Sequence, residues 1–190
     1  MGRSCGVILC CLVLAAGCAY LGYLKDPFVD IPGFYRVNEA LYRGGQPDGR
    51  GWQRLHSLDI KTVVSLRGEN KDSRLESEAT QSMGMRSFVI PMSVYTAPSD
   101  EQVIKFLEII LEPSNRPVFV HCDSGRDRTG AMIALYRVVV DGWTIKRAYR
   151  EARNLGFFPY HGKEAPLKTF VHQLKDKQEY FQKAREFKAR

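Results

Sequence analysis

The residues best suited to chemistry lie together in the segment 121–130, which reads HCDSGRDRTG. Within it, Cys122 can act as a nucleophile once its thiol is ionised, and Arg128 can bind two oxygens of a phosphate group with its planar guanidinium. The other cysteines all lie at or before Cys18, so no internal disulfide can form in residues 34–190. We therefore expect Cys122 to be a reactive thiol beside an anion-binding site.

The sequence around this segment predicts a strand before it and a helix after it. Residues 117–121 (PVFVH) are short and apolar, and an apolar helical stretch follows from Gly130 to Asp141. In an α/β sheet, ligands bind where strands end and helices begin. There the free N–H groups of the loop and of the first helical turn, with the positive end of the helix dipole, form a socket for a tetrahedral anion. Gly125 and Gly130 allow the backbone to turn where a Cβ would hinder it.

The same socket should stabilise the anionic form of a thiol at its mouth. Cys122 would then be nucleophilic at neutral pH without a dedicated base. Arg128 would hold the charge of a phosphoryl group as that group moves, and Thr129 would donate a hydrogen bond to the departing sulfur. His121 is expected to brace the loop by hydrogen bonding. The residues expected to surround the phosphate are Asp123, Ser124, Gly125, Arg126, Asp127 and Arg128.

Cys122, followed after five residues by Arg128 and Thr129, resembles the signature of the protein tyrosine phosphatase superfamily. The whole loop and the helix AMIALYRVVVDGW after it look most like the compact dual-specificity branch, in particular its small exported bacterial members and its atypical fungal and plant ones. The similarity extends from about Phe34, through the stretch LYRGGQP, to about Leu174. It implies a two-step reaction in which a phosphocysteine forms on Cys122 and is then hydrolysed, with no metal or other cofactor.

The general acid has two candidates. Members of this superfamily commonly supply an aspartate from a mobile loop upstream of the cysteine, and the only acid in that region here is Asp100, whose position also suits the first turn of a helix. Asp127, inside the loop, is the rival, because some bacterial relatives with a KDRTG ending are thought to use that aspartate. A salt bridge that orients an arginine is the alternative role of Asp127. We favour Asp127 over Asp100.

The positive charge of the chain is compatible with three functions. The net charge of +7 suits an anionic substrate or surface, but no dense basic block interleaved with aromatic residues favours nucleic acid. Arg126 is a second cation in the loop, either a solvated charge at the rim or a contact for an inositol-type substrate. We expect a monomer that acts on phosphorylated proteins as a tyrosine or dual-specificity phosphatase. The alternatives are a phosphatase of phosphoinositides or inositol phosphates, and an inactive module that binds phosphate.

Strand and helix patterns alternate along the rest of the chain. This alternation predicts an α/β architecture, with a central, mainly parallel sheet flanked by helices. Ser99 and Gln102 form a capping box that predicts a helix start. The expected strands or strand pairs are 34–43, 61–66, 86–91 and 117–121, and the other expected helices are 52–58, 73–83, 130–141, 145–154 and 167–190.

The first residues predict a membrane-targeting segment. No charged residue lies between Cys5 and Leu24, which is typical of a secretory signal. The stretch 14–18 (LAAGC) resembles a bacterial lipobox, in which Cys18 would be lipidated, although Ala15 stands where leucine is usual. Ala19 after this cysteine would favour the outer membrane.

An uncleaved signal anchor is the alternative, and a buried core helix is a third reading. About twenty uncharged residues can span a bilayer, and Arg3 would keep the near end cytoplasmic. Residues 1–24 would thus tether the protein to a membrane in either of the first two cases. We expect residues 25–33 to be a linker and residues 34–190 an extracytoplasmic catalytic domain, in the bacterial periplasm if the lipobox is used.

Overall fold

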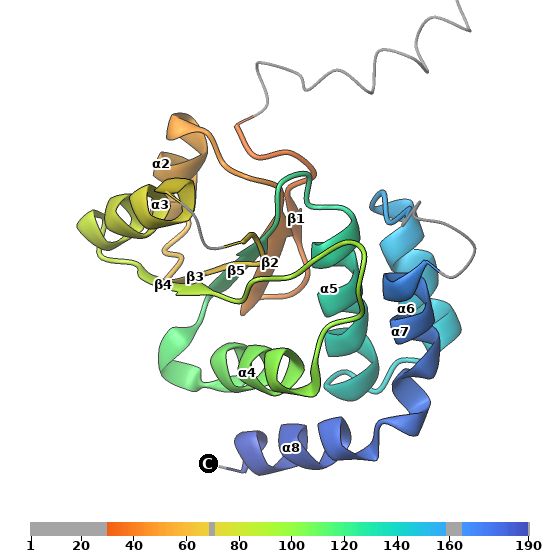
Figure 1. Ribbon diagram of the computed structural model, residues 1–190. Coiled ribbons are helices and arrows are strands. Elements are labelled where there is room, and N and C mark those ends of the chain that lie inside the picture. Colours follow the sequence, from red (N-terminus) through yellow and green to blue (C-terminus); the bar gives the residue numbers. More distant parts are fainter. Residues whose placement is uncertain (1–29, 69–70, 159–164, 190) are drawn as a thin grey trace, which may run out of the picture. The chain divides into compact units, whose positions relative to one another are not determined.

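The computed structural model describes residues 30–68, 71–158 and 165–189 (Figure 1). The predicted targeting segment, including Cys18, lies outside these residues. The described fold begins inside the segment expected to be a linker, because Ile31 is 1% exposed and Pro32 O accepts a hydrogen bond from Gly45 N. Within the described ranges, no helix has the length and apolar character needed to cross a membrane.

A five-stranded sheet forms the centre of the domain, in the order β1-β2-β5-β3-β4. Its first pair, β1 with β2, is antiparallel, and the other pairs are parallel. The strand that precedes the reactive loop, β5, therefore lies between β2 and β3. The bounds of the strands are β1 Tyr35–Arg36, β2 Leu41–Gly44, β3 Thr62–Ser65, β4 Arg86–Val89 and β5 Val118–His121.

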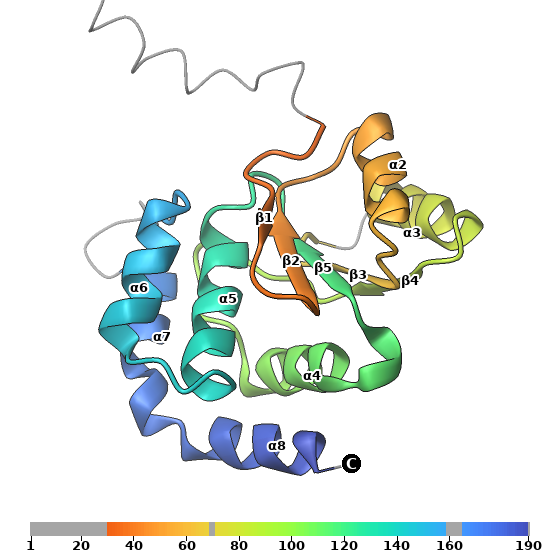
Figure 2. The same cartoon turned by 180° about the vertical axis from the view of Figure 1, so that it is seen from behind.

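Helices cover both faces of this sheet (Figures 1 and 2). The helices α2 and α3 lie on one face, α4 and α5 on the other, and α6, α7 and α8 pack outside α5 and α4. The bounds are α2 Gly49–Ser57, α3 Lys71–Ser82, α4 Asp100–Leu111, α5 Asp127–Val139, α6 Ile145–Asn154, α7 Pro166–Gln173 and α8 Gln178–Lys188. This arrangement confirms the predicted α/β architecture with a mainly parallel sheet.

Successive side chains of the central strands point alternately into two buried layers. This explains why the sequences of these strands are continuously apolar. On β5, Val118 and Val120 belong to the core beneath α4 and α5, whereas Phe119 belongs to the core beneath α2. Val63 and Val64 of β3 divide between the two layers in the same way. A strand buried on both faces is held in register by side chains on each side, so its carboxyl end is a firm base for the loop that follows.

Two helices differ from the sequence prediction. The helix expected over residues 167–190 divides into α7 and α8 around a 3-10 turn, Leu174–Asp176. The reason is packing: α7 contacts α5, whereas α8 contacts α4, and one straight helix cannot follow both. The helix after the reactive loop begins at Asp127 instead of Gly130, so part of the expected loop is already its first turn.

The predicted start of α4 is confirmed. The capping box at the start of α4 forms as expected, with Ser99 Oγ accepting a hydrogen bond from Gln102 N and the Gln102 side chain accepting one from Ser99 N. Gly142 follows α5 with φ of +69°, a left-handed conformation that favours glycine.

Candidate active site

Residues 122–126 join the carboxyl end of β5 to the amino end of α5. Gly125 turns this loop with φ of +70°, and a Cβ there would lie 2.4 Å from Gly44 C and from Gly45 N. A Cβ on Gly45 would lie 2.7 Å from Asp123 O. The loop thus rests directly on Gly44, the last residue of β2, and on Gly45 after it, and it needs glycine on both sides of the contact.

Cys122 is 2% exposed and is not part of a disulfide. Behind it, Thr129 is fully buried, and its hydroxyl has no hydrogen-bond partner among the described residues. The hydrogen bond that we expected between this hydroxyl and the sulfur is therefore not formed in this structure. A buried hydroxyl without a hydrogen-bond partner lowers the stability of the fold. Such a group is compatible with a binding site in which a ligand supplies the missing hydrogen bond.

Arg128 extends over the carboxyl ends of the neighbouring strands. Its Nη1 lies 3.3 Å from Leu66 O and 3.5 Å from Met92 O, and its Nη2 donates to Asp123 Oδ2 at 2.6 Å. The side chain is 13% exposed, and its buried Nε has no partner in the described part of the chain. The guanidinium therefore has an N–H group that is free to take an anion.

Asp123 bridges two arginines. Its second oxygen lies 2.8 Å from Arg67 Nε, so the carboxylate joins Arg67 to Arg128. Partial burial would raise the pKa of Asp123, but the hydrogen bond and charge of Arg128, with those of Arg67, outweigh it and lower the pKa overall. Asp123 is thus held as a carboxylate at the mouth of the loop, where it can orient both guanidiniums.

A buried network braces the loop from the side of α3. His121 is fully buried, with Nε2 2.8 Å from Glu76 Oε1 and Nδ1 3.2 Å from Cys122 O. Burial would raise the pKa of Glu76, but the hydrogen bond and charge of His121, together with Arg67, lower it overall. Arg67 Nη1 also donates to Gln46 Oε1 at 2.5 Å. His121 occupies the position expected of a bracing residue, and the other members of this network, Glu76, Arg67 and Gln46, come from three other segments.

The two candidate acids face other parts of the molecule. Asp100, the first residue of α4, accepts hydrogen bonds from Tyr180 Oη at 2.5 Å and from Lys177 Nζ at 3.1 Å. These bonds, first that of Tyr180, lower the pKa of Asp100. Asp127, the first residue of α5, accepts a hydrogen bond from Phe158 N at 2.8 Å. Within the described residues, its carboxylate makes this bond and not the salt bridge to an arginine that we weighed.

The remaining loop residues lie at the rim or under α5. Ser124 is half-buried and Arg126 is exposed. The aliphatic part of Arg126 packs over Gly156, where a Cβ would lie 3.0 Å from Arg126 Cδ. Gly130 is helical, contrary to the expectation that it serves the turn, and a Cβ on it would lie 2.9 Å from the ring of Phe157. Its small size therefore allows the segment after α6 to approach α5.

Sequence reasoning missed three residues that the fold brings to the loop, namely Gln46, Arg67 and Glu76. They come from the turn after β2, the turn after β3 and the middle of α3. Each is a polar residue at or near the carboxyl end of a predicted strand or in a polar helix. The strand order places β2 and β3 on either side of β5, and knowledge of that order would have been needed to predict that these residues reach the loop.

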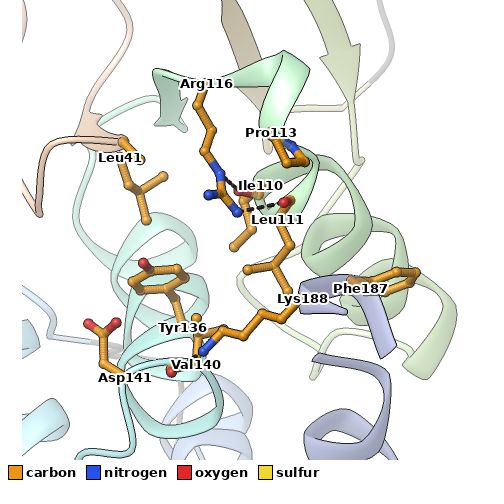
Figure 3. A pocket seen from close by; sticks show the side chains of 11 residues that line it. Leu41, Ile110, Leu111, Pro113, Arg116, Tyr136, Val140, Asp141, Phe187 and Lys188 are labelled. Atoms are coloured by element: carbon orange, nitrogen blue, oxygen red, sulfur yellow. Dashed lines mark hydrogen bonds between the residues drawn. The ribbon is translucent and has the colours of Figure 1, made fainter. Parts of the chain in front are cut away.

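A pocket of about 260 Å³ lies at the other end of α5, away from the loop (Figure 3). Its two cations are engaged with helix ends: Arg116 donates to Ile110 O and Leu111 O, and Lys188 Nζ donates to Val140 O at 2.7 Å. These side chains cap the carboxyl ends of α4 and α5, which is a structural role.

Comparisons with known proteins agree on one family. The model of the family described as DSP-PTPase phosphatase fused to NAD+ kinase matches residues 34–169. The dual specificity protein phosphatase TpbA of Pseudomonas aeruginosa is 30% identical over 139 residues, which are 70% of this chain and 57% of that protein. The inositol diphosphatase DSP4 of Arabidopsis thaliana is 27% identical over 128 residues, which are 65% of this chain and 64% of that protein. The chain therefore spans less than two thirds of the length of either relative.

Solved structures give the same fold. The catalytic domain of the PP-IP phosphatase SIW14 from S. cerevisiae has a TM-score of 0.69 at 23% identity and covers 83% of this chain and 94% of that one. The structure of P. aeruginosa TpbA has a TM-score of 0.66 at 24% identity and covers 81% and 91% of the two chains. At this identity the likeness concerns the fold.

Proposed function

Because the chain belongs to the family of dual-specificity phosphatases that resemble protein tyrosine phosphatases, we propose that it hydrolyses phosphate monoesters of proteins through a phosphocysteine on Cys122. The observation that carries this proposal is the placement of a buried, unpaired cysteine at the carboxyl end of β5, directly before the amino end of α5 and Arg128. Helix N–H groups and a guanidinium there suit both a thiolate and a phosphate.

The reaction proceeds in two displacements. The Cys122 thiolate attacks phosphorus, the bond from phosphorus to the ester oxygen breaks, and the alcohol leaves with a proton from an acid. Water then attacks the phosphocysteine, so inorganic phosphate leaves and the thiolate is restored. Arg128 Nε, which has no partner among the described residues, is available to a phosphate oxygen while Asp123 holds Nη2. The hydroxyl of Thr129, which also has no partner among the described residues, is available to donate to the departing sulfur.

Asp127 remains our candidate for the acid. Two hydrogen bonds favour the ionised form of Asp100 and commit it to α8, which makes Asp100 a poor proton donor at neutral pH. Asp127 lies one residue before Arg128, and its only hydrogen bond in the described structure comes from a backbone amide. Comparing the pH dependence of kcat in Asp127→Asn and Asp100→Asn tests this choice. Only the variant of the acid should lose the fall of kcat at high pH, and only in that variant should kcat become more sensitive to the basicity of the leaving group.

A second substrate class is supported by charge and by the relatives. Arg67 adds a cation beside Arg128, and Arg126 adds another at the rim. One relative is an inositol diphosphatase and one similar structure is a PP-IP phosphatase. Turnover of a panel of phosphotyrosine, phosphoserine and phosphothreonine peptides, against inositol phosphates and phosphoinositides, separates these classes by kcat/KM.

Turnover of an aryl phosphate by the wild type, abolished in Cys122→Ser, is the direct test of the proposal. A protein that only binds phosphate would show no turnover in either form. We also expect the reaction to need no metal ion, so EDTA should leave the rate unchanged. Inhibition by EDTA that added metal reverses would contradict that part of the proposal.

We propose, from sequence alone, that residues 1–24 tether this activity to a membrane on its extracytoplasmic side. The absence of charge from Cys5 to Leu24 and the lipobox-like stretch before Cys18 support this. Mass spectrometry of the mature amino terminus distinguishes a lipidated Cys18 from an uncleaved anchor.

A further inference from the structure

Arg43 is a buried cation beneath the loop. Its side chain lies on β2 and is 1% exposed, and Nη2 donates to the carbonyl oxygen of Gly125. Its Nε and Nη1 are buried without a hydrogen-bond partner in the described residues, and no ion pair joins it to a carboxylate there. An isolated buried charge is strongly unfavourable unless an opposite charge lies nearby. The fold therefore calls for an anion close to Arg43.

The charged groups around Arg43 leave one candidate for that anion. Burial lowers the pKa of Arg43 to about 10, and the charge of Cys122 is the strongest influence that raises it again, ahead of Glu151 and Tyr35. Glu151 on α6 already binds Arg137, with oxygens 2.7 Å and 3.0 Å from two of its nitrogens. Tyr35 lies on strand β1, whose two residues are exposed, and it is the weakest of the three influences.

Several other ionisable groups around Cys122 are paired with one another. Arg128, from α5, binds Asp123. His121, from β5, binds Glu76 on α3. Asp127, from α5, accepts a hydrogen bond from Phe158 N. Among the described residues, none of these carboxylates forms an ion pair with Arg43, which leaves the Cys122 sulfur as the anion for its guanidinium.

We propose that Arg43 is a positioning residue whose buried guanidinium is the counter-ion of the Cys122 thiolate. Arg128 faces the incoming phosphate from the rim, whereas Arg43 acts from within the protein and keeps the nucleophile ionised before any substrate arrives. By binding Gly125 O it also fixes the left-handed turn that shapes the loop. This inference rests on the proposed nucleophilic role of Cys122.

The topology explains how a residue so distant in sequence reaches this place. The strand β2 pairs in parallel with β5, and Arg43 lies opposite Val120, two residues before the cysteine. The next residues, Gly44 and Gly45, let the loop lie against the end of β2. The guanidinium can therefore extend along the strand and pass under the loop.

Alkylation of Cys122 by iodoacetamide, measured against pH without any substrate, tests the charge directly. Arg43→Lys keeps a cation, whereas Arg43→Gln keeps a donor for Gly125 O and loses the charge. At pH 6 we expect roughly tenfold slower alkylation in Arg43→Gln than in the wild type, and a much smaller change in Arg43→Lys. At high pH, where the thiol is ionised in every variant, the rates should converge. Arg36→Gln, on the exposed strand β1, is the matched control.

Two results would overturn the proposal. Equal profiles for Arg43→Gln and the wild type would show that the charge has no effect on the thiol. Equal slowing in Arg43→Gln and Arg43→Lys would assign Arg43 to the hydrogen bond with Gly125 alone. Alkylation needs no turnover. If the alkylation profiles behave as expected but the protein hydrolyses no phosphate ester, the result contradicts the proposed function and leaves the ion pair between Arg43 and Cys122 intact.

A second measurement avoids variants of Arg43. In the wild type, the NMR signal of Arg43 Nε should move with pH at the same midpoint as the alkylation rate. In Cys122→Ser this movement should vanish, because the alcohol does not ionise. A signal that stays fixed in the wild type, or that moves equally in Cys122→Ser, would contradict the ion pair even if substitutions of Arg43 prevent folding.

Discussion

Asp123 and Gly125 illustrate how closely single residues of the loop are constrained. One carboxylate oxygen of Asp123 lies 2.6 Å from Arg128 Nη2 and the other 2.8 Å from Arg67 Nε, so two guanidiniums share one anion. On the opposite side of the loop, Gly125 touches the backbone of β2 with no room for a methyl group. The charge of Asp123 holds Arg67 and Arg128 in place. The backbone of the loop can lie this close to β2 because Gly125 has no side chain.

Gly125→Ala should destabilise the domain and abolish activity. The added Cβ would lie 2.4 Å from two backbone atoms of β2, at a φ of +70° that alanine rarely adopts. We expect a loss of about 2–4 kcal/mol in the free energy of unfolding, measured in urea. Gly49→Ala is the matched control, since a Cβ there meets nothing within 4 Å. Equal stability of Gly125→Ala and the wild type would mean that the loop does not rest on β2 as described.

Glu76→Gln should remove a pH-dependent part of the stability. The pKa of Glu76 is lower in the folded protein than its ordinary value, mainly through His121 against the opposing effect of burial. Such a carboxyl stabilises the fold above its unfolded pKa, and this contribution is lost as pH falls through the folded pKa. We expect a difference of about 1–2 kcal/mol between wild type and variant at pH 7, shrinking below about pH 4.

The control for this experiment is Glu78→Gln, an exposed carboxyl on the same helix. Its effect on unfolding in urea should be small at every pH. A difference between wild type and Glu76→Gln that grows on acidification would contradict the network.

At the scale of elements, the order of strands and helices follows from the sequence, because each buried strand is short and apolar, a capping box starts α4, and Gly142 follows the end of α5. The division between α7 and α8 does not, since it depends on which helices they pack against. The same holds at the site. Cys122 and Arg128 are adjacent in one segment and were recognised there, whereas Arg43, Arg67 and Glu76 reach the loop through the sheet order β2-β5-β3, which no local pattern specifies.

Tyr180→Phe tests the contact between α4 and α8. Tyr180 is fully buried, and its hydroxyl donates to Asp100 at the start of α4. Burial and this hydrogen bond raise the pKa of Tyr180, so it remains a donor at all working pH values. We expect the free energy of unfolding to fall by about 1 kcal/mol, while kcat and its pH dependence stay unchanged. A shift in the basic limb of kcat, where a general acid loses its proton, would instead make Asp100 the better candidate for the acid.

At the scale of the whole molecule, four neighbouring segments surround the loop. Several buried polar groups around it have no hydrogen-bond partner among the described residues. Arg43, Arg128 and Thr129 each have at least one such atom among the described residues. Their hydrogen-bonding capacity is lost on folding unless an anion restores it. The stability of the domain should therefore depend on what occupies the loop.

Orthovanadate should raise the melting temperature. A ligand at one hundred times its Kd adds about 2.7 kcal/mol to the free energy of unfolding when it binds the folded state alone. Sodium chloride of equal ionic strength is the control for screening, and Arg128→Met should lose most of the gain. A gain that chloride reproduces, or that survives Arg128→Met, would mean that the anion acts elsewhere on this basic protein.

The pairing of β2 with β5 has a consequence for the reactivity of Cys122 during folding of the newly synthesised chain. Residues at opposite ends of a long stretch of chain must meet before Arg43 lies opposite Val120, two residues before Cys122. On a nascent or partly folded chain the sulfur lacks that neighbour and the helix end beyond it, so it should resemble an ordinary thiol. Sensitivity to peroxide would then arise together with competence to bind phosphate, in one folding event.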